Sequence, residues 1–185
     1  MKRRHAVLLL ASGCIAGCST PGRPVDPGAR RREIDGAVDN ALADLYMNVP
    51  RARALTDSAE AMLVIPRVIT AGLVVGATAG TGALRKGPST LAYYSVAGGS
   101  IGLLAGAQSH ALYVLFMTRE ALDRFQASNG WTAGVDASVV VLDAGATARA
   151  GSGRPQGAVL AFVRGQQGFM ANVSFDGTRF TRLEL

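Results

Sequence analysis

Ser100 and His110 carry the side chains best suited to nucleophilic catalysis. The segment Gly98-Gly99-Ser100-Ile101-Gly102 matches G-x-S-x-G, the nucleophile elbow in which a serine lies on a sharp turn between a strand and a helix. That motif also needs a histidine base later in the chain, and His110 is the only histidine beyond residue 5. Without an imidazole partner a serine hydroxyl keeps its high pKa and is a poor nucleophile. We therefore interpret the segment as a glycine-rich turn. A hydrolase that uses Ser100 is the least favoured function, after the two that are described at the end of this section.

The other polar residues form no catalytic or metal-binding pattern. One histidine cannot build a zinc site, which needs three or four ligands from Cys, His and carboxylates. No two carboxylates have the spacing of an acid–base pair. Arg85-Lys86-Gly87 does not fit the phosphate-loop motif and is interpreted as a basic turn. We expect His110 to lie partly exposed at the end of a strand. The sequence predicts a protein that is not an enzyme, with no catalytic residues, no metal and no cofactor.

Cys18 has the clearest chemical signal. Three cations, Lys2-Arg3-Arg4, precede an uncharged run that ends in Ile15-Ala16-Gly17-Cys18. A charged start, a short apolar run and small residues before the cleavage site are typical of a secretory signal. The ending resembles the bacterial lipobox, in which the thiol is diacylated and the chain is cut before the cysteine. We therefore predict a lipoprotein signal peptide over residues 1–17, a lipid anchor at Cys18 and a lipidated tether over residues 18–28; the alternative is an ordinary signal with a stray cysteine.

The residues after Cys18 indicate where such an anchor would reside. Ser19 and Thr20 follow the cysteine, and an Asp there would resemble the retention signal of the inner membrane. We therefore expect the outer membrane, with the protein on the periplasmic face. Cys14 would be lost with the signal, so the mature chain would contain no disulfide and no cysteine metal site.

Arg30, Arg31 and Arg32 form a cationic run about a dozen residues after the predicted anchor. Close to anionic lipid, each cation contributes about 1 kcal/mol of attraction. A solvated first turn of a helix is the alternative, although cations at a helix N-terminus oppose its dipole. We predict that these three arginines bind anionic phospholipid.

The composition favours a single domain built mainly from strands. The chain contains 23 glycines, 49% hydrophobic residues and only 17% charged residues, which disfavours a helical bundle and disorder. Loss of Lys2, Arg3 and Arg4 would lower the formal net charge from +6 to +3, and so mild a charge does not indicate a nucleic-acid partner. We predict one domain over residues 29–185.

Local signals place helices first and strands after them. Asp26-Pro27 is typical of a helix start, apolar residues at three- and four-residue spacing continue to Val49, and a second short helix reaches about Ala59. Apolar runs separated by Gly, Pro and Ser then predict short strands, with a helix over 119–127 capped by Thr118, and a strand over 139–142. The runs are 62–65, 69–75, 91–96, 101–105 and 112–116.

The C-terminal residues suggest a three-strand antiparallel meander. Strands over 158–163 and 169–175 would flank Gly165-Gln166-Gln167-Gly168, and Asp176-Gly177 would join the second strand to 178–185. Residues 144–155 are predicted to form an exposed loop. The fold class is therefore α+β, with N-terminal helices followed by a curved, mainly antiparallel β-sheet or small barrel with one intervening helix. A membrane-spanning hairpin within 87–118, which lacks formal charge, is a disfavoured alternative because the segment is rich in polar residues and glycine.

Four motifs in order resemble the SYLF-domain family, with its bacterial lipoprotein branch the most similar. The resemblance covers roughly residues 35 to 185. It implies lipid binding: eukaryotic members bind phosphoinositides through a basic amphipathic helix, whose matching positions here are Arg30 to Arg32, and no catalytic residues are implied. The motifs are Ile65-Pro66 before Ala71-Gly72, Gly76-x-x-x-Gly80-x-Gly82, Gly102-x-x-x-Gly106-Ala107-Gln108, and Gly165-Gln166-Gln167-Gly168.

These observations together predict an outer-membrane lipoprotein whose periplasmic domain binds anionic phospholipid surfaces. The alternative is a structural or protein-interaction module of the cell envelope that the anchor merely localises. In that case Tyr93, Tyr94 and Trp131 would form the interaction surface. Taken by itself, Trp131 is predicted to be a core or rim anchor, with a ligand role as the alternative.

Overall fold

The computed structural model describes residues 26–49, 52–72, 75–101, 106–142, 157–167 and 177–185. Within these residues the chain forms three helices and eight strands. The helices are α1 (Pro27–Asn48), α2 (Ala52–Asp57) and α3 (Arg119–Ala127). The strands are β1 (Ala61–Gly72), β2 (Val75–Lys86), β3 (Ser89–Ile101), β4 (Gly106–Phe116), β5 (Trp131–Thr132), β6 (Val140–Leu142), β7 (Val159–Gln167) and β8 (Arg179–Leu183).

The helices begin where local capping signals place them. Asp26 accepts hydrogen bonds from the backbone N–H groups of Gly28 and Ala29, and Pro27 occupies the first position of α1. Thr118 accepts one from the N–H of Ala121 at the start of α3. A side chain that satisfies an otherwise unpaired N–H stabilises a helix start by about 1 kcal/mol. The predicted starts of both helices are confirmed.

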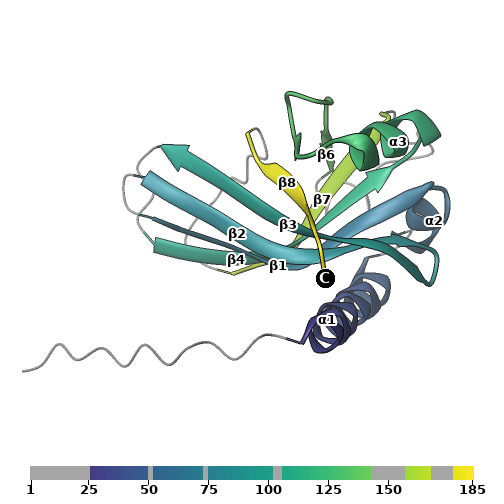
Figure 1. The fold of residues 1–185 in the computed structure, drawn as a ribbon, viewed down its shortest axis with the longest axis horizontal. Coiled ribbons are helices and arrows are strands. Elements are labelled where there is room, and N and C mark those ends of the chain that lie inside the picture. The colour runs from purple at the N-terminus through teal and green to yellow at the C-terminus, as the bar shows by residue number, and fades with distance from the viewer. Residues whose placement is uncertain (1–25, 50–51, 73–74, 102–105, 143–156, 168–176) are drawn as a thin grey trace, which may run out of the picture.

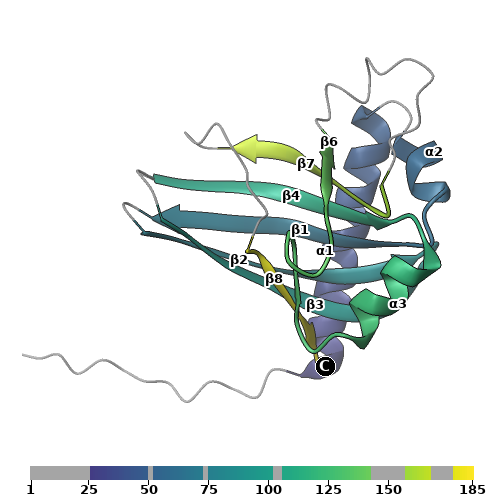
Figure 2. The same cartoon turned by 90° about the horizontal axis from the view of Figure 1, so that it is seen from above.

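The eight strands form one sheet in the order β5-β8-β3-β2-β1-β4-β7-β6. All neighbours are antiparallel except β6 and β7, which are parallel. The sheet is strongly curled, with α1 lying against one face and α3 against the other (Figures 1 and 2). This arrangement confirms the predicted α+β fold, a curved and mainly antiparallel sheet with one helix between its strands.

Strands β1 to β4 are longer than the sequence predicts, because they run through their glycines instead of ending there. β2 continues through Gly76, Gly80 and Gly82, and β3 continues through Gly98-Gly99. A Cβ on Gly82 would lie 1.9 Å from the carbonyl oxygen of Val64, so only glycine fits at this crossing. The register of β1 shifts between Val64 and Arg67, beside Pro66. Glycine at position 82 thus permits close approach of the two backbones. The predicted turn at 98–102 is wrong for its described residues, which belong to β3.

The membrane-hairpin alternative for residues 87–118 is also wrong. Its described residues form β3 and β4, which pair with β2 and β1 along most of their lengths. Among the described residues, no helix combines the length and the apolar character needed to cross a membrane.

The predicted C-terminal meander is wrong in its pairing. β7 pairs with β4 and β6, whereas β8 pairs with β3 and β5, and four strands lie between them. Gly165 adopts a φ of +66° within β7 and does not begin a turn, since the strand continues to Gln167. The predicted strand over 169–175 and the predicted loop over 144–155 lie outside the described residues. Turn signals specify local bends, but they do not specify which strand becomes the neighbour.

Two cores lie on opposite faces of the sheet. The core on the α3 side is aromatic: the Phe125 ring lies tilted against Phe116 and Tyr94, with ring centroids 4.6 and 4.7 Å away, and Trp131 lies edge-on to Phe125 at 5.6 Å. Trp131 is thereby confirmed as a core anchor. The core on the α1 side includes Ile34, Val38 and Leu45 of the helix, packed on Met62, Val64, Ala83, Tyr113, Leu115, Leu160 and Phe162 of the sheet.

Candidate functional site

The predicted lipid-binding arginines occupy the first turns of α1. Arg30 pairs with Glu33 at 2.8 Å and donates a hydrogen bond of 3.4 Å to Thr81 of β2, so this side chain reaches the sheet. Arg32 lies 3.7 Å from the Asp26 carboxylate, and 76% of its side chain is exposed. Arg31 is exposed and forms no hydrogen bond or ion pair with the described residues. Arg31 and Arg32 are therefore the two members that point to solvent.

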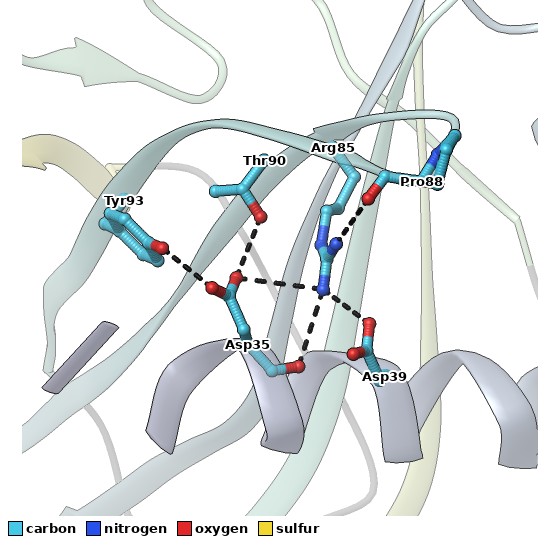
Figure 3. Close-up of polar contacts among 6 residues, drawn as sticks. All are labelled: Asp35, Asp39, Arg85, Pro88, Thr90 and Tyr93. Atoms are coloured by element: carbon cyan, nitrogen blue, oxygen red, sulfur yellow. Dashed lines mark hydrogen bonds and ion pairs between the residues drawn. The ribbon is translucent and has the colours of Figure 1, made fainter. Parts of the chain in front are cut away.

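A buried arginine fixes α1 on the sheet (Figure 3). Arg85 of β2 donates a hydrogen bond of 2.9 Å to the carbonyl of Pro88 and forms an ion pair with Asp39 of α1. The same guanidinium lies 3.7 Å from the Asp35 carboxylate. Only 9% of the Arg85 side chain is exposed. The predicted basic turn is thus wrong at Arg85, which joins the sheet to the helix.

Asp35 extends this network to β3. Its two carboxylate oxygens accept hydrogen bonds of 2.8 Å from the hydroxyls of Thr90 and Tyr93 (Figure 3). Burial, followed by the hydrogen bond to Asp35, raises the pKa of the Tyr93 phenol. The phenol therefore remains a neutral donor at physiological pH, and α1 is held in one register against β2 and β3.

A second polar contact holds the C-terminal half of α1 against β7. Arg164 donates through Nε to Asp44 at 2.6 Å, and this hydrogen bond lowers the pKa of the Asp44 carboxyl. The Tyr113 hydroxyl of β4 donates a hydrogen bond of 2.9 Å to the carbonyl of Ala41 in the same helix. Burial raises the pKa of Tyr113 to about 12. Both ends of α1 are thus attached to the sheet by polar side chains.

An open cavity of about 330 Å³ lies beside this second contact. Its walls come from α1, β1, β4 and β7. Its polar lining comprises two arginines, one carboxylate, two hydroxyl groups and one imidazole, at Arg67, Arg164, Asp44, Ser109, Tyr113 and His110. Arg67 is exposed and forms no ion pair with the described residues. The sequence gives no sign of this cavity because its residues lie on four separate elements.

The structure does not bring Ser100 and His110 together. Ser100 of β3 pairs with Gly76 of β2, which pairs with Gly72 of β1, which in turn pairs with Gly106 of β4. Ser100 is therefore level with Gly106, three strands away. His110 lies four residues beyond Gly106, which adds roughly 14 Å along β4 at 3.4 Å per residue, so the two side chains are far apart. Ser100 thus has a strand context and lacks the strand-turn-helix context of the elbow motif.

His110 itself differs from the expectation. It lies within β4 with only 4% of its surface exposed, so the predicted partly exposed strand end is wrong. Burial lowers the pKa of its imidazole and favours the neutral form. No group of His, Cys, Asp and Glu suited to a metal ion occurs among the described residues.

Two residues of the alternative interaction surface are buried. Tyr94 and Trp131 are 2% and 3% exposed, and both belong to the aromatic core on the α3 side. They cannot contact a partner, so this surface is wrong; Tyr93 is half-buried and bound to Asp35. The predicted anchor, Cys18, and the signal peptide lie outside the described residues.

A curled antiparallel sheet with a capping helix on each face is the class of domain to which this chain belongs. Residues 97–184 match the family model described as Ysc84, Las17-binding protein actin regulator. Over these residues the chain belongs to the SYLF-domain family, which is a lipid-binding family. No curated protein matches the chain.

The structure extends the domain beyond the matched residues. β1 and β2 precede residue 97, yet they lie between β3 and β4 at the centre of the sheet. β1 pairs with β4 from Ala61↔Phe116 to Gly72↔Gly106, so the matched and unmatched strands share one hydrogen-bonded ladder. The family domain of this chain therefore includes both segments.

Proposed function

We propose that this protein is a non-enzymatic outer-membrane lipoprotein of the bacterial SYLF branch whose periplasmic domain binds anionic phospholipid surfaces. Cys18 would carry the acyl chains after removal of residues 1–17, and α1 would follow the tether directly. Two or more acyl chains give stable attachment, whereas one gives only marginal binding.

The observation that carries this proposal is the position of Arg31 and Arg32 on α1. Both are exposed on the first turns of the helix that would follow the anchor. The network of Arg85, Asp35 and Asp39 fixes that helix on the sheet, so the two guanidinium groups face solvent in a defined direction. Membership of a lipid-binding family makes an anionic bilayer the natural partner for them.

The test is vesicle co-sedimentation of mature protein that carries Cys18→Ser, so that the anchor contributes nothing. The double variant Arg31→Gln/Arg32→Gln should lower binding to phosphatidylglycerol-containing vesicles about thirtyfold at low salt, because each cation contributes about 1 kcal/mol. The matched control is Arg119→Gln/Arg124→Gln on α3, whose cations are equally exposed but lie on the opposite face of the sheet. Equal recovery of the unsubstituted domain with neutral and anionic vesicles would contradict the proposal.

A further inference from the structure

Helix α1 covers only part of its face of the sheet. Thr81 faces α1, because its hydroxyl accepts a hydrogen bond from Arg30, and alternate residues of a strand share a face. Further along β1 to β4, the residues on this face are exposed. We call them the distal sheet face: Ile69, Ala71, Val75, Ala77, Ala79, Ala97 and Ala107.

Strand pairing makes the distal sheet face continuous. Ile69 lies opposite Ala79 on one side, and Ala79 lies opposite Ala97. Ala71 lies between Ala77 and Ala107 in the next row. Ile69 and Val75 are 45% and 67% exposed, and with the five exposed alanines they form a patch, which is more informative than isolated exposed apolar residues. The face therefore presents contiguous apolar surface to solvent.

Cations outnumber carboxylates around this surface: the cavity lining contains Arg67 and Arg164 against the single carboxylate of Asp44. None of the eight strands contains Asp or Glu, although the chain has 13 such residues. Arg67 and Arg164 lie where the distal sheet face meets α1, and both line the cavity of about 330 Å³. Arg164 uses Nε for Asp44, which leaves its terminal nitrogens for another acceptor, and Arg67 has no partner among the described residues. The cavity is within the size range of small-ligand sites.

We propose that the cavity binds the phosphate of a bilayer phospholipid through Arg67 and Arg164, while the distal sheet face lies against its hydrocarbon. One guanidinium group can donate two parallel hydrogen bonds to two oxygens of the same phosphate, which makes arginine well suited to such a site. This inference rests on the proposed function and adds a second contact, separate from Arg31 and Arg32.

Charge and position favour a bilayer over a second copy of the chain. Two copies joined through this face would bring like cations together at their shared border, which is unfavourable. A phospholipid surface instead presents anionic phosphate next to hydrocarbon. The phosphate would match the arginines of the cavity, and the hydrocarbon would match the apolar side chains of the distal sheet face. α1, which would follow the lipidated tether, also lies on this side of the sheet (Figure 2).

The experiment compares single variants of the mature Cys18→Ser protein on vesicles of phosphatidylglycerol with phosphatidylethanolamine. Arg67→Gln should weaken binding about fivefold, the effect of one cation near an anionic surface. Val75→Ser should weaken it about tenfold, which corresponds to the transfer of one valine side chain. The matched controls, Arg119→Gln and Val135→Ser, replace exposed residues outside the distal sheet face and the cavity, and should bind like the unsubstituted domain.

The outcomes separate this inference from the proposed function. If the unsubstituted domain does not bind anionic vesicles, the proposed function fails. If it binds and Arg67→Gln and Val75→Ser bind equally well, only the present inference is overturned. It is also overturned if Val75→Ser dissociates a lipid-free dimer in sedimentation equilibrium, because the face then joins two copies. Thermal unfolding of each variant confirms that binding is measured on folded protein.

Discussion

Arg85 of β2 and Asp39 of α1 form an ion pair across the boundary between the sheet and the helix that covers it. The guanidinium is buried in the sheet, whereas the Asp39 side chain is 64% exposed. Asp35, one turn earlier, contacts the same group and also binds two hydroxyls of β3. Arg85 therefore helps to fix the position of α1 on the sheet, and with it the direction of the cations on its first turns.

Replacement of Arg85 by methionine should lower the free energy of unfolding by about 2 kcal/mol, because Asp35 and Asp39 lose their cation while partly desolvated. The loss is below that of a fully buried pair because Asp39 is largely exposed. Urea denaturation of the Cys18→Ser protein measures it. The control is Lys86→Met, whose pair with Glu60 is exposed on both sides and should contribute less than about 1 kcal/mol. Equal effects of the two substitutions would show that the Arg85 network does not stabilise α1.

Replacement of Gly82 by alanine should lower the free energy of unfolding by about 3 kcal/mol or more. The new Cβ would meet the Val64 carbonyl and the Ile65 Cα, which are backbone atoms that cannot move aside without breaking the pairing of β1 with β2. Gly36→Ala is the matched control: nothing lies within 4 Å of the place its methyl group would take, so alanine should stabilise α1 by up to about 1 kcal/mol. Thermal unfolding should move in opposite directions for the two variants, and a stable Gly82→Ala protein would contradict the close crossing.

The pKa of Tyr113, raised to about 12, predicts a loss of stability at alkaline pH. Below pH 10, the ordinary value for tyrosine, the phenol is neutral in both states. Between pH 10 and 12 the unfolded chain loses the proton and the folded chain keeps it, so stability falls by about 2 to 3 kcal/mol. Tyr113→Phe should be about 1 kcal/mol less stable at neutral pH, through loss of the bond to Ala41, yet more stable than the unsubstituted protein near pH 12. Urea midpoints at the two pH values check this crossover.

Replacement of Cys18 by serine should release the protein from the membrane fraction of its native cells. Without the thiol there is no site for acyl chains, and the remaining surface contacts are reversible and sensitive to salt. Cys14→Ser is the control, because Cys14 lies inside the predicted signal peptide and should leave fractionation unchanged. Mass spectrometry of the N-terminal peptide should show a modified Cys18 in the control and in the unsubstituted protein. An unmodified cysteine there would exclude the lipoprotein proposal.

The sequence predicts the helices well because their signals are local. Asp26-Pro27 and Thr118 satisfy N–H groups two or three residues away, and no distant residue is needed to interpret them. The strands are less predictable. Glycine is equally compatible with a turn and with close backbone contact, and only the position of Val64 shows that Gly82 has the second role.

The candidate site likewise has a part that local sequence signals predict and a part that depends on strand order. Arg31 and Arg32 can be placed on the start of α1 from sequence, since that helix is defined by its own residues. Arg67 and Arg164 cannot be brought together in this way. They lie about a hundred residues apart and become neighbours only because β1, β4 and β7 are consecutive in the sheet. The same non-local order explains why the predicted C-terminal meander is wrong.

The central position of β1 and β2 has a practical consequence for recombinant work. A fragment limited to residues 97–184 would retain β4 and the end of β3, but not the two strands that join them. Unpaired strand edges recruit other chains. Such a truncated product is therefore expected to aggregate on expression, and a soluble preparation requires a clone that begins before α1.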